Sequence, residues 1–294
     1  MIKKNLNIEE TFYLALKSHK KNDFSSAEKL YNEILKKNPN HFNSIFYLAS
    51  MFAQISNFNK AKEWFEKAIK IKPDYAIAYS NLGAVFKELG NFKESIKTCE
   101  KAIEIDPKYS AAYSNLGAAL REVGRFKDSV NVCEKALKIQ KNNFGALHNL
   151  ALSLQELNEI EKAKDCYKIL SKIQSNPGNA YQNLGKLSTM IGKKKEAINF
   201  YRLAIKYEPK NLFYYSSLSD LDKNILDENL KIKINHIIKR NKNKSENTAH
   251  AHFLLSKYEL NLKNYQKEFD HLINGHNHYF ESKKIYTPKR LIIG

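Results

Sequence analysis

The chain has little proline and little glycine, with 6 and 10 residues in a length of 294. Both residue types interrupt regular backbone structure, so their scarcity excludes a collagen-like chain and a Gly/Pro-rich disordered one. Hydrophobic residues make up 43% of the sequence, which is enough for a buried core. We therefore expect a folded, largely helical protein, long enough for about two ordinary domains.

Cysteine and long apolar runs are also scarce. Cys99, Cys133 and Cys166 are too few for a disulfide scaffold, and we expect them to be core residues in a reducing compartment. No run of about 18 or more apolar residues occurs, and the basic start is followed by the acidic pair Glu9 and Glu10. The sequence thus predicts a cytoplasmic protein without a membrane span.

Acidic residues are outnumbered, which gives a net charge of +18, but only 5 of the 49 basic residues are arginine. A basic balance can indicate a nucleic-acid or membrane partner. Arginine, however, is the residue type that recognises phosphates and bases with a bidentate fork. We therefore expect solvated lysine-rich helices and no specific nucleic-acid partner.

A repeat of 34 residues organises most of the chain. Pro39, Pro73, Pro107 and Pro209 are separated by multiples of 34, and Lys141 and Ser175 occupy the two intermediate positions. Six units result, over 8–41, 42–75, 76–109, 110–143, 144–177 and 178–211, after a tail of residues 1–7. Such a period predicts a stack of supersecondary units, each of which buries its apolar face against its neighbours.

Each unit has the pattern of a helical hairpin. We number the residues of each unit from 1 to 34. Positions 4, 7, 8 and 11 form an apolar stripe of a first helix, and positions 20, 24 and 27 form an apolar stripe of a second helix. Position 8 is always small: Ala15, Ala49, Gly83, Gly117, Ala151 and Gly185. Position 15, between the two helices, is glycine or asparagine in five of the six units, as a left-handed helix end requires.

This pattern resembles the tetratricopeptide repeat (TPR) family, and residues 78–107 carry it almost completely. Repeats three and four are most similar to the TPR region of O-linked N-acetylglucosamine transferase. The resemblance implies an all-α fold, an α-solenoid superhelix whose concave groove is lined by first helices and binds peptide segments. It covers about two thirds of the chain.

Candidate groove residues follow from repeat positions 5, 6 and 9. Asparagine occurs at position 6 in four successive units, where an amide offers two donors and one acceptor to a peptide backbone. The candidate residues are Asn81, Asn115, Asn149, Asn183, Tyr13, Tyr47, Ser80, Ser114, His148, Gln182 and Lys186. An alternative is that asparagine is simply common at this position of the repeat.

Two further features of these positions limit the ligand. Only Lys186 is basic among positions 5 and 9, so a clamp for an acidic C-terminal peptide is not expected. The first two units are aromatic instead, with Phe12, Tyr13, Phe46 and Tyr47. These rings either anchor an apolar ligand group or pack as a terminal cap.

The pattern is lost after residue 211. Residues 212–244 are expected to form an irregular helical linker, and 245–284 a TPR-like hairpin before a tail of 285–294. The hairpin resembles the one that joins TPR arrays to the catalytic domain in bacterial TPR-sulfotransferase proteins, although Glu268 stands where that family usually has alanine. The phosphate-binding loop of that catalytic domain is absent from the sequence.

No catalytic or metal-binding pattern is visible. Six of the nine histidines lie after residue 235, but His276 and His278 diverge by about 200° on one helix and cannot chelate one ion. We expect no cofactor, no metal and no enzyme activity, and interpret the chain as an interaction module for a protein or peptide. Two alternatives stay open: the recognition half of a truncated or split sulfotransferase or glycosyltransferase, and a basic surface for nucleic acid or membrane.

Overall fold

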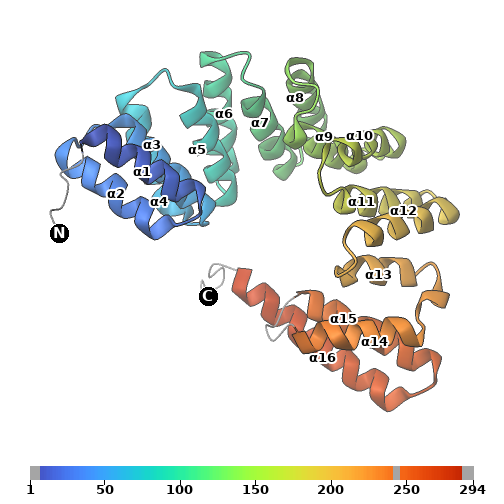
Figure 1. The fold of residues 1–294 in the computed structure, drawn as a ribbon. Helices are drawn as coiled ribbons and strands as arrows, with labels where there is room; N and C mark the ends of the chain where they lie inside the picture. The colour runs from blue at the N-terminus through green and yellow to red at the C-terminus, as the bar shows by residue number, and fades with distance from the viewer. Residues whose placement is uncertain (1–6, 241–245, 287–294) are drawn as a thin grey trace, which may run out of the picture. The chain divides into compact units, whose positions relative to one another are not determined.

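The computed structural model describes residues 7–240 and 246–286, and within these ranges all regular elements are helical. The predicted all-α fold class is therefore confirmed for the part of the chain that the structure describes. The first eight helices (Figure 1) are α1 Ile8–Lys20, α2 Phe24–Lys37, α3 Phe42–Gln54, α4 Phe58–Ile71, α5 Ala76–Glu88, α6 Phe92–Ile105, α7 Ser110–Glu122 and α8 Phe126–Ile139. The next four helices are α9 Phe144–Glu156, α10 Ile160–Ile173, α11 Gly178–Met190 and α12 Lys194–Tyr207.

The chain forms two compact units, residues 1–166 and 167–294. Their boundary lies inside α10, within the fifth repeat, and not at an end of any repeat that the sequence defines. We describe each unit by itself. Across residues 7–240 and 246–286, no helix combines the length and the hydrophobicity that a membrane span requires.

Helix boundaries in the six repeats follow the 34-residue spacing. Every first helix begins at position 1 and every second helix at position 17. The start of α1 is fixed by a capping box, in which the Asn7 side chain accepts from the backbone N–H of Glu10 at 2.8 Å and the Glu10 side chain accepts from that of Asn7. Local capping and the repeat pattern thus agree.

Position 15 has a left-handed backbone in every repeat. Gly90, Gly124 and Gly192 have φ between 73° and 76°, and Asn22 and Asn158 have φ near 60°. The sixth residue is Ser56, which departs from the Gly/Asn pattern and still has a φ of 59°. The hairpin geometry therefore imposes this conformation even where the side chain does not favour it.

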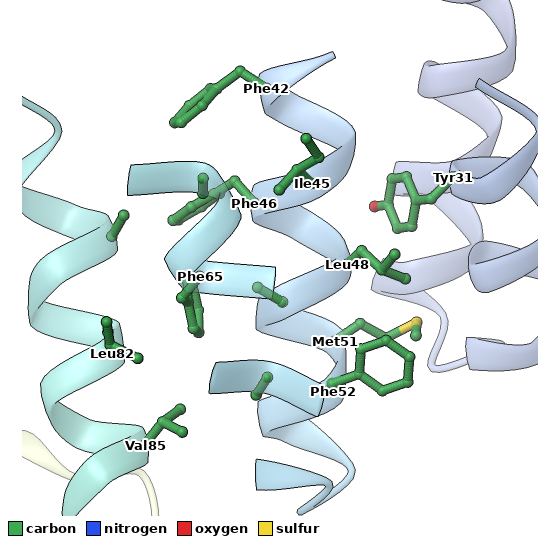
Figure 2. Close-up of a cluster of buried hydrophobic side chains, with 14 of the residues drawn as sticks. Tyr31, Phe42, Ile45, Phe46, Leu48, Met51, Phe52, Phe65, Leu82 and Val85 are labelled. Atoms are coloured by element: carbon green, nitrogen blue, oxygen red, sulfur yellow. The ribbon is translucent and has the colours of Figure 1, made fainter. Parts of the chain in front are cut away.

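The core of the first unit is largest in the second repeat. Figure 2 shows Phe46, Leu48 and Met51 of α3 buried together with Tyr31 of the preceding repeat and Leu82 of the following one. Each of these side chains is less than 9% exposed. Stacking therefore buries apolar faces that one hairpin would leave in water.

Small residues at position 8 allow the two helices of a hairpin to approach closely. A Cβ atom on Gly83 would lie 2.4 Å from Sγ of Cys99, and one on Gly117 would lie 2.4 Å from Sγ of Cys133. Behind each glycine, a buried serine of the second helix donates to the glycine carbonyl: Ser95 to Gly83 at 2.7 Å, and Ser129 to Gly117 at 2.8 Å.

The second unit continues beyond the sixth repeat with α13 Leu212–Ser219, the 3₁₀ helix η1 Lys223–Ile225, α14 Glu228–Arg240, α15 Glu246–Asn261 and α16 Tyr265–Tyr286. Helices α13 and α14 begin 34 residues after α11 and α12, so helix spacing persists where the apolar pattern does not. In α14 the buried residues are Leu230 and Ile234. Each lies one residue before a position of the second-helix apolar stripe, position 20 or position 24 of the repeat. The basic segment 241–245 lies outside the described residues.

Helices α15 and α16 form an antiparallel hairpin whose turn contains Lys263 with a φ of 60°. Their close approach occurs at Gly275, where a Cβ atom would lie 2.6 Å from the ring of Phe253. Glu268, which stands where the TPR-sulfotransferase family usually has alanine, is half-buried on the first turns of α16, and the close contact at Gly275 forms in its presence.

Candidate functional site

The first helices of successive repeats form one layer in the first unit. Helix α5 packs against α7, and α7 packs against α9. Small residues at the contacts permit this approach, since a Cβ atom on Gly145 of α9 would lie 2.5 Å from Oγ of Ser114 on α7. We call the exposed side of this layer the first-helix face.

Two of the predicted asparagines connect neighbouring helices of this layer. The amide nitrogen of Asn115 donates to the carbonyl oxygen of Ser80 at 3.1 Å and lies 2.9 Å from its hydroxyl. The amide nitrogen of Asn149 donates to the carbonyl oxygen of Ser114 at 3.2 Å. Both bonds join residues 35 apart, so each amide is held in one orientation by the preceding repeat.

In the side-chain amides of Asn115 and Asn149 the nitrogen is hydrogen-bonded to the preceding repeat, and the oxygen can accept a hydrogen bond from a ligand. Within the described residues, Oδ1 of Asn115 and Oδ1 of Asn149 accept no hydrogen bond, and both side chains are half-buried rather than covered. A fixed carbonyl-type acceptor at the same position of two successive repeats can accept from the backbone N–H groups of an extended chain.

The other two asparagines differ. Asn81 faces a preceding repeat with Phe46 in place of serine, and its amide has no hydrogen bond within the described residues. Asn183 belongs to the second unit, where its amide donates to the carbonyl oxygen of Asn179 in the same helix at 2.9 Å. Gln182 and Lys186 share that helix and are half-buried and exposed, respectively. Only Asn115 and Asn149 therefore form the inter-helix bond.

Ser80 and Ser114 do not line a surface, which corrects the expectation from the sequence. They are 0% and 6% exposed and lie beneath the asparagines, to which they offer hydrogen-bond acceptors. The reason is the close packing of the first helices, which covers position 5 in these two repeats.

The aromatic residues of the first two repeats pack mainly against one another. The ring centroid of Tyr47 lies 5.8 Å from that of Phe12 and 5.5 Å from that of Phe46. His19 joins this cluster through Tyr31 and through Tyr47, whose ring centroid lies 6.3 Å from its own. These contacts favour the terminal cap of the two alternatives, although Tyr13 itself is 67% exposed.

Charged residues at position 12 were overlooked in the sequence. Lys87 forms a 2.6 Å ion pair with Glu88, and Arg121 forms a 2.5 Å pair with Glu122, exactly one repeat later. The pKa of His148 on α9, the first helix of the following repeat, is lowered mainly by burial and to a smaller extent by the positive charge of Arg121. The repeated Lys/Arg–Glu dipeptide was the signal that could have revealed these positions.

Comparisons with known proteins agree with this geometry. Models of the tetratricopeptide repeat match residues 74–142, 132–165 and 178–211, and a TPR repeat model matches 49–90. The chain carries tetratricopeptide repeats. The resemblances to O-linked N-acetylglucosamine transferase and to the TPR-sulfotransferase hairpin rest on the sequence alone and remain predictions. A search of curated proteins finds no match.

Solved structures show the same TPR solenoid fold. The Cut9–Hcn1 hetero-tetramer of APC/C aligns with a TM-score of 0.65 at 14% identity over 72% of this chain and 42% of that chain. PilW, described as a widely conserved type IV pilus biogenesis factor, gives 0.64 at 21% identity, over 72% and 97%. Pseudomonas aeruginosa pilF gives 0.61 at 17% identity, also over 72% and 97%. At these identities the likeness concerns the fold.

Beyond the TPR repeats, the second unit contains a histidine cluster. Nδ1 of His252 lies 3.1 Å from Nδ1 of His271, and the ring of His278 stacks on that of His252 at 5.4 Å. His276 instead lies against Phe253 at 5.3 Å. Within the described residues no three His, Cys, Asp or Glu side chains are arranged to bind a metal ion.

The cysteines of the TPR core are free and buried. Burial raises the pKa of both Cys99 and Cys133 to about 12, so these thiols stay protonated at neutral pH. They contribute to the contact with the position-8 glycines and not to chemistry.

Proposed function

We propose that this protein is a non-catalytic TPR interaction module that binds a peptide or protein segment on the first-helix face of residues 76–156. The observation that carries the proposal is the pair of oriented amides, Asn115 and Asn149, whose nitrogens are bound by Ser80 and Ser114 and whose oxygens are unused within the described residues. A preorganised acceptor costs less conformational entropy on binding than a mobile one.

The geometry favours an extended backbone as the ligand. The two amides occur at the same position of successive TPR repeats, and contacts to a backbone do not depend on the side chains of the ligand. The neighbouring basic groups, Lys87 and Arg121, are each paired with a glutamate, so they do not create a free positive site for a terminal carboxylate. Asn81 lies on the same face, and Tyr13 of α1 is a further candidate contact toward the N-terminus.

A paired measurement of affinity and stability tests the proposal. Binders would be selected from a random peptide library, and their affinity compared for the wild type, Asn115→Ala and Asn115→Ala/Asn149→Ala. We expect each alanine to weaken binding by about 1 kcal/mol, the net value of a hydrogen bond, and hence the double variant by about thirtyfold.

The control is Ser80→Ala, which removes a hydroxyl beneath the face without removing any group on it. This variant should lower the melting temperature more than it lowers affinity. Equal affinity of the wild type and a folded Asn115→Ala/Asn149→Ala variant for every selected peptide would show that the asparagines are only structural.

A further inference from the structure

Prolines and tyrosines are paired at the repeat junctions. Three of the four prolines at the 34-residue spacing are followed six residues later by tyrosine, in the pairs Pro73–Tyr79, Pro107–Tyr113 and Pro209–Tyr215. The hydroxyl of Tyr113 donates to the carbonyl oxygen of Pro107 at 3.2 Å, and that of Tyr215 to the carbonyl oxygen of Pro209 at 3.3 Å. At Pro107 and Pro209 the tyrosine thus covers the proline turn and satisfies its carbonyl group, whereas within the described residues Tyr79 forms no hydrogen bond to Pro73.

The fourth junction lacks this ring. Pro39 is followed six residues later by Ile45, a shorter side chain that is 2% exposed and belongs to the buried cluster of Figure 2. A hollow of about 450 Å³ opens there, with Leu35, Ile45 and Trp64 among the apolar residues that line it. Within the described residues the carbonyl oxygen of Pro39 accepts no hydrogen bond.

The rim of this hollow is basic. Lys67 and Lys70 line it, both are exposed, and Nζ of Lys67 lies 4.2 Å from the centre of the Trp64 ring. Lys135 and Lys138 stand at the same two positions of the repeat that contains Tyr113. The filled and the open junction therefore share these two lysines, and they differ in the tyrosine, which is Ile45 in the open junction, and in Val132, which stands where the open junction has Trp64.

We propose that the hollow at Pro39 binds a tyrosine side chain from an acidic segment of a partner protein. The incoming ring takes the place that Tyr113 has at Pro107, packs against Trp64, and donates its hydroxyl to the carbonyl oxygen of Pro39. Acidic residues beside the tyrosine pair with Lys67 and Lys70. This site lies on the second-helix side of the junction and does not depend on the asparagines.

The single tryptophan of the chain makes the site directly observable. The probe is the peptide acetyl-Glu-Glu-Tyr-Glu-Glu-amide, added to the full-length protein while Trp64 emission is recorded. We expect a saturable change in emission with this peptide and none with its alanine counterpart. The phenylalanine counterpart should bind about fivefold more weakly, because it cannot donate to Pro39.

Three variants decide the outcome. Ile45→Tyr should fill the hollow from within and abolish the response, while Tyr113→Ile should open a second hollow and raise the stoichiometry of peptide measured by calorimetry from one to two. Lys67→Glu/Lys70→Glu changes only exposed groups, so it keeps the test valid if Ile45→Tyr fails to fold, and it should weaken binding severalfold. Absence of saturable binding to the wild type, or undiminished binding to the charge-reversed variant, would overturn the proposal.

Discussion

At the residue scale, the close approach of neighbouring helices depends on small residues at their contacts. Position 8 can be read directly from the sequence as a small residue, because the repeat aligns six examples of it. The orientation of Asn115 could not be predicted, since it is set by the carbonyl group of Ser80, a residue of another helix. The burial of Ser80 and Ser114 was missed for the same reason: helix-to-helix distance is a property of the stack.

Substitution of Gly117 tests the close contact inside a hairpin. Alanine is favoured over glycine in a helix by about 1 kcal/mol, but its Cβ would lie 2.4 Å from Sγ of Cys133. We expect Gly117→Ala to destabilise the fold by about 1–2 kcal/mol in urea unfolding, since overpacking costs about 1–3 kcal/mol. In a Cys133→Ala background the same substitution should become stabilising, and an unchanged sign would disprove the contact.

The histidine cluster predicts a dependence of stability on pH. Burial, followed by the proximity of His271 and His278, lowers the pKa of His252 to about 4, against a reference near 6.5. The unfolded chain therefore binds a proton before the folded one does, and stability is lost as the pH falls from about 6.5 toward about 4. Melting temperatures over this range should fall less steeply for His252→Gln than for the wild type, and parallel curves would exclude a contribution from this group.

At the scale of helices, the sequence predicted the six hairpins well because a 34-residue repeat averages out local exceptions. Ser56 is such an exception, and it has the same backbone as the glycines at its position. For the C-terminal part the sequence predicted an irregular helical linker and a hairpin, but not which face of the linker helix is buried. Helix α14 buries Leu230 and Ile234 out of phase with the pattern, because it packs against α15 without a repeated counterpart.

The hairpin turns allow a stabilising substitution. Ser56 has a φ of 59°, a conformation that costs a residue with a side chain about 1 kcal/mol relative to glycine. Ser56→Gly should therefore raise the free energy of unfolding by about 0.5–1 kcal/mol. The reverse substitution Gly90→Ser, at the equivalent turn, should lower it by a similar amount. Changes of the same sign in both variants would contradict this explanation.

At the scale of the whole molecule, each repeat contacts mainly its neighbours, and the chain divides into two compact units. Unfolding should therefore not be a single all-or-none transition. Trp64 reports on the second repeat, beside the largest cluster of buried residues, whereas circular dichroism reports on all helices. We expect the denaturant midpoint of Trp64 emission to exceed that of the helical signal. Coincident transitions would show that the two units unfold together.

The central claim is that the first-helix face of residues 76–156 binds an extended peptide through Asn115 and Asn149. A crystal structure of the protein with the tightest peptide selected from a library tests it most directly. The claim predicts backbone N–H groups of the peptide within hydrogen-bond distance of Oδ1 of both asparagines, with the amide nitrogens still bound to Ser80 and Ser114. A peptide bound elsewhere, with both amide oxygens facing water, would contradict it.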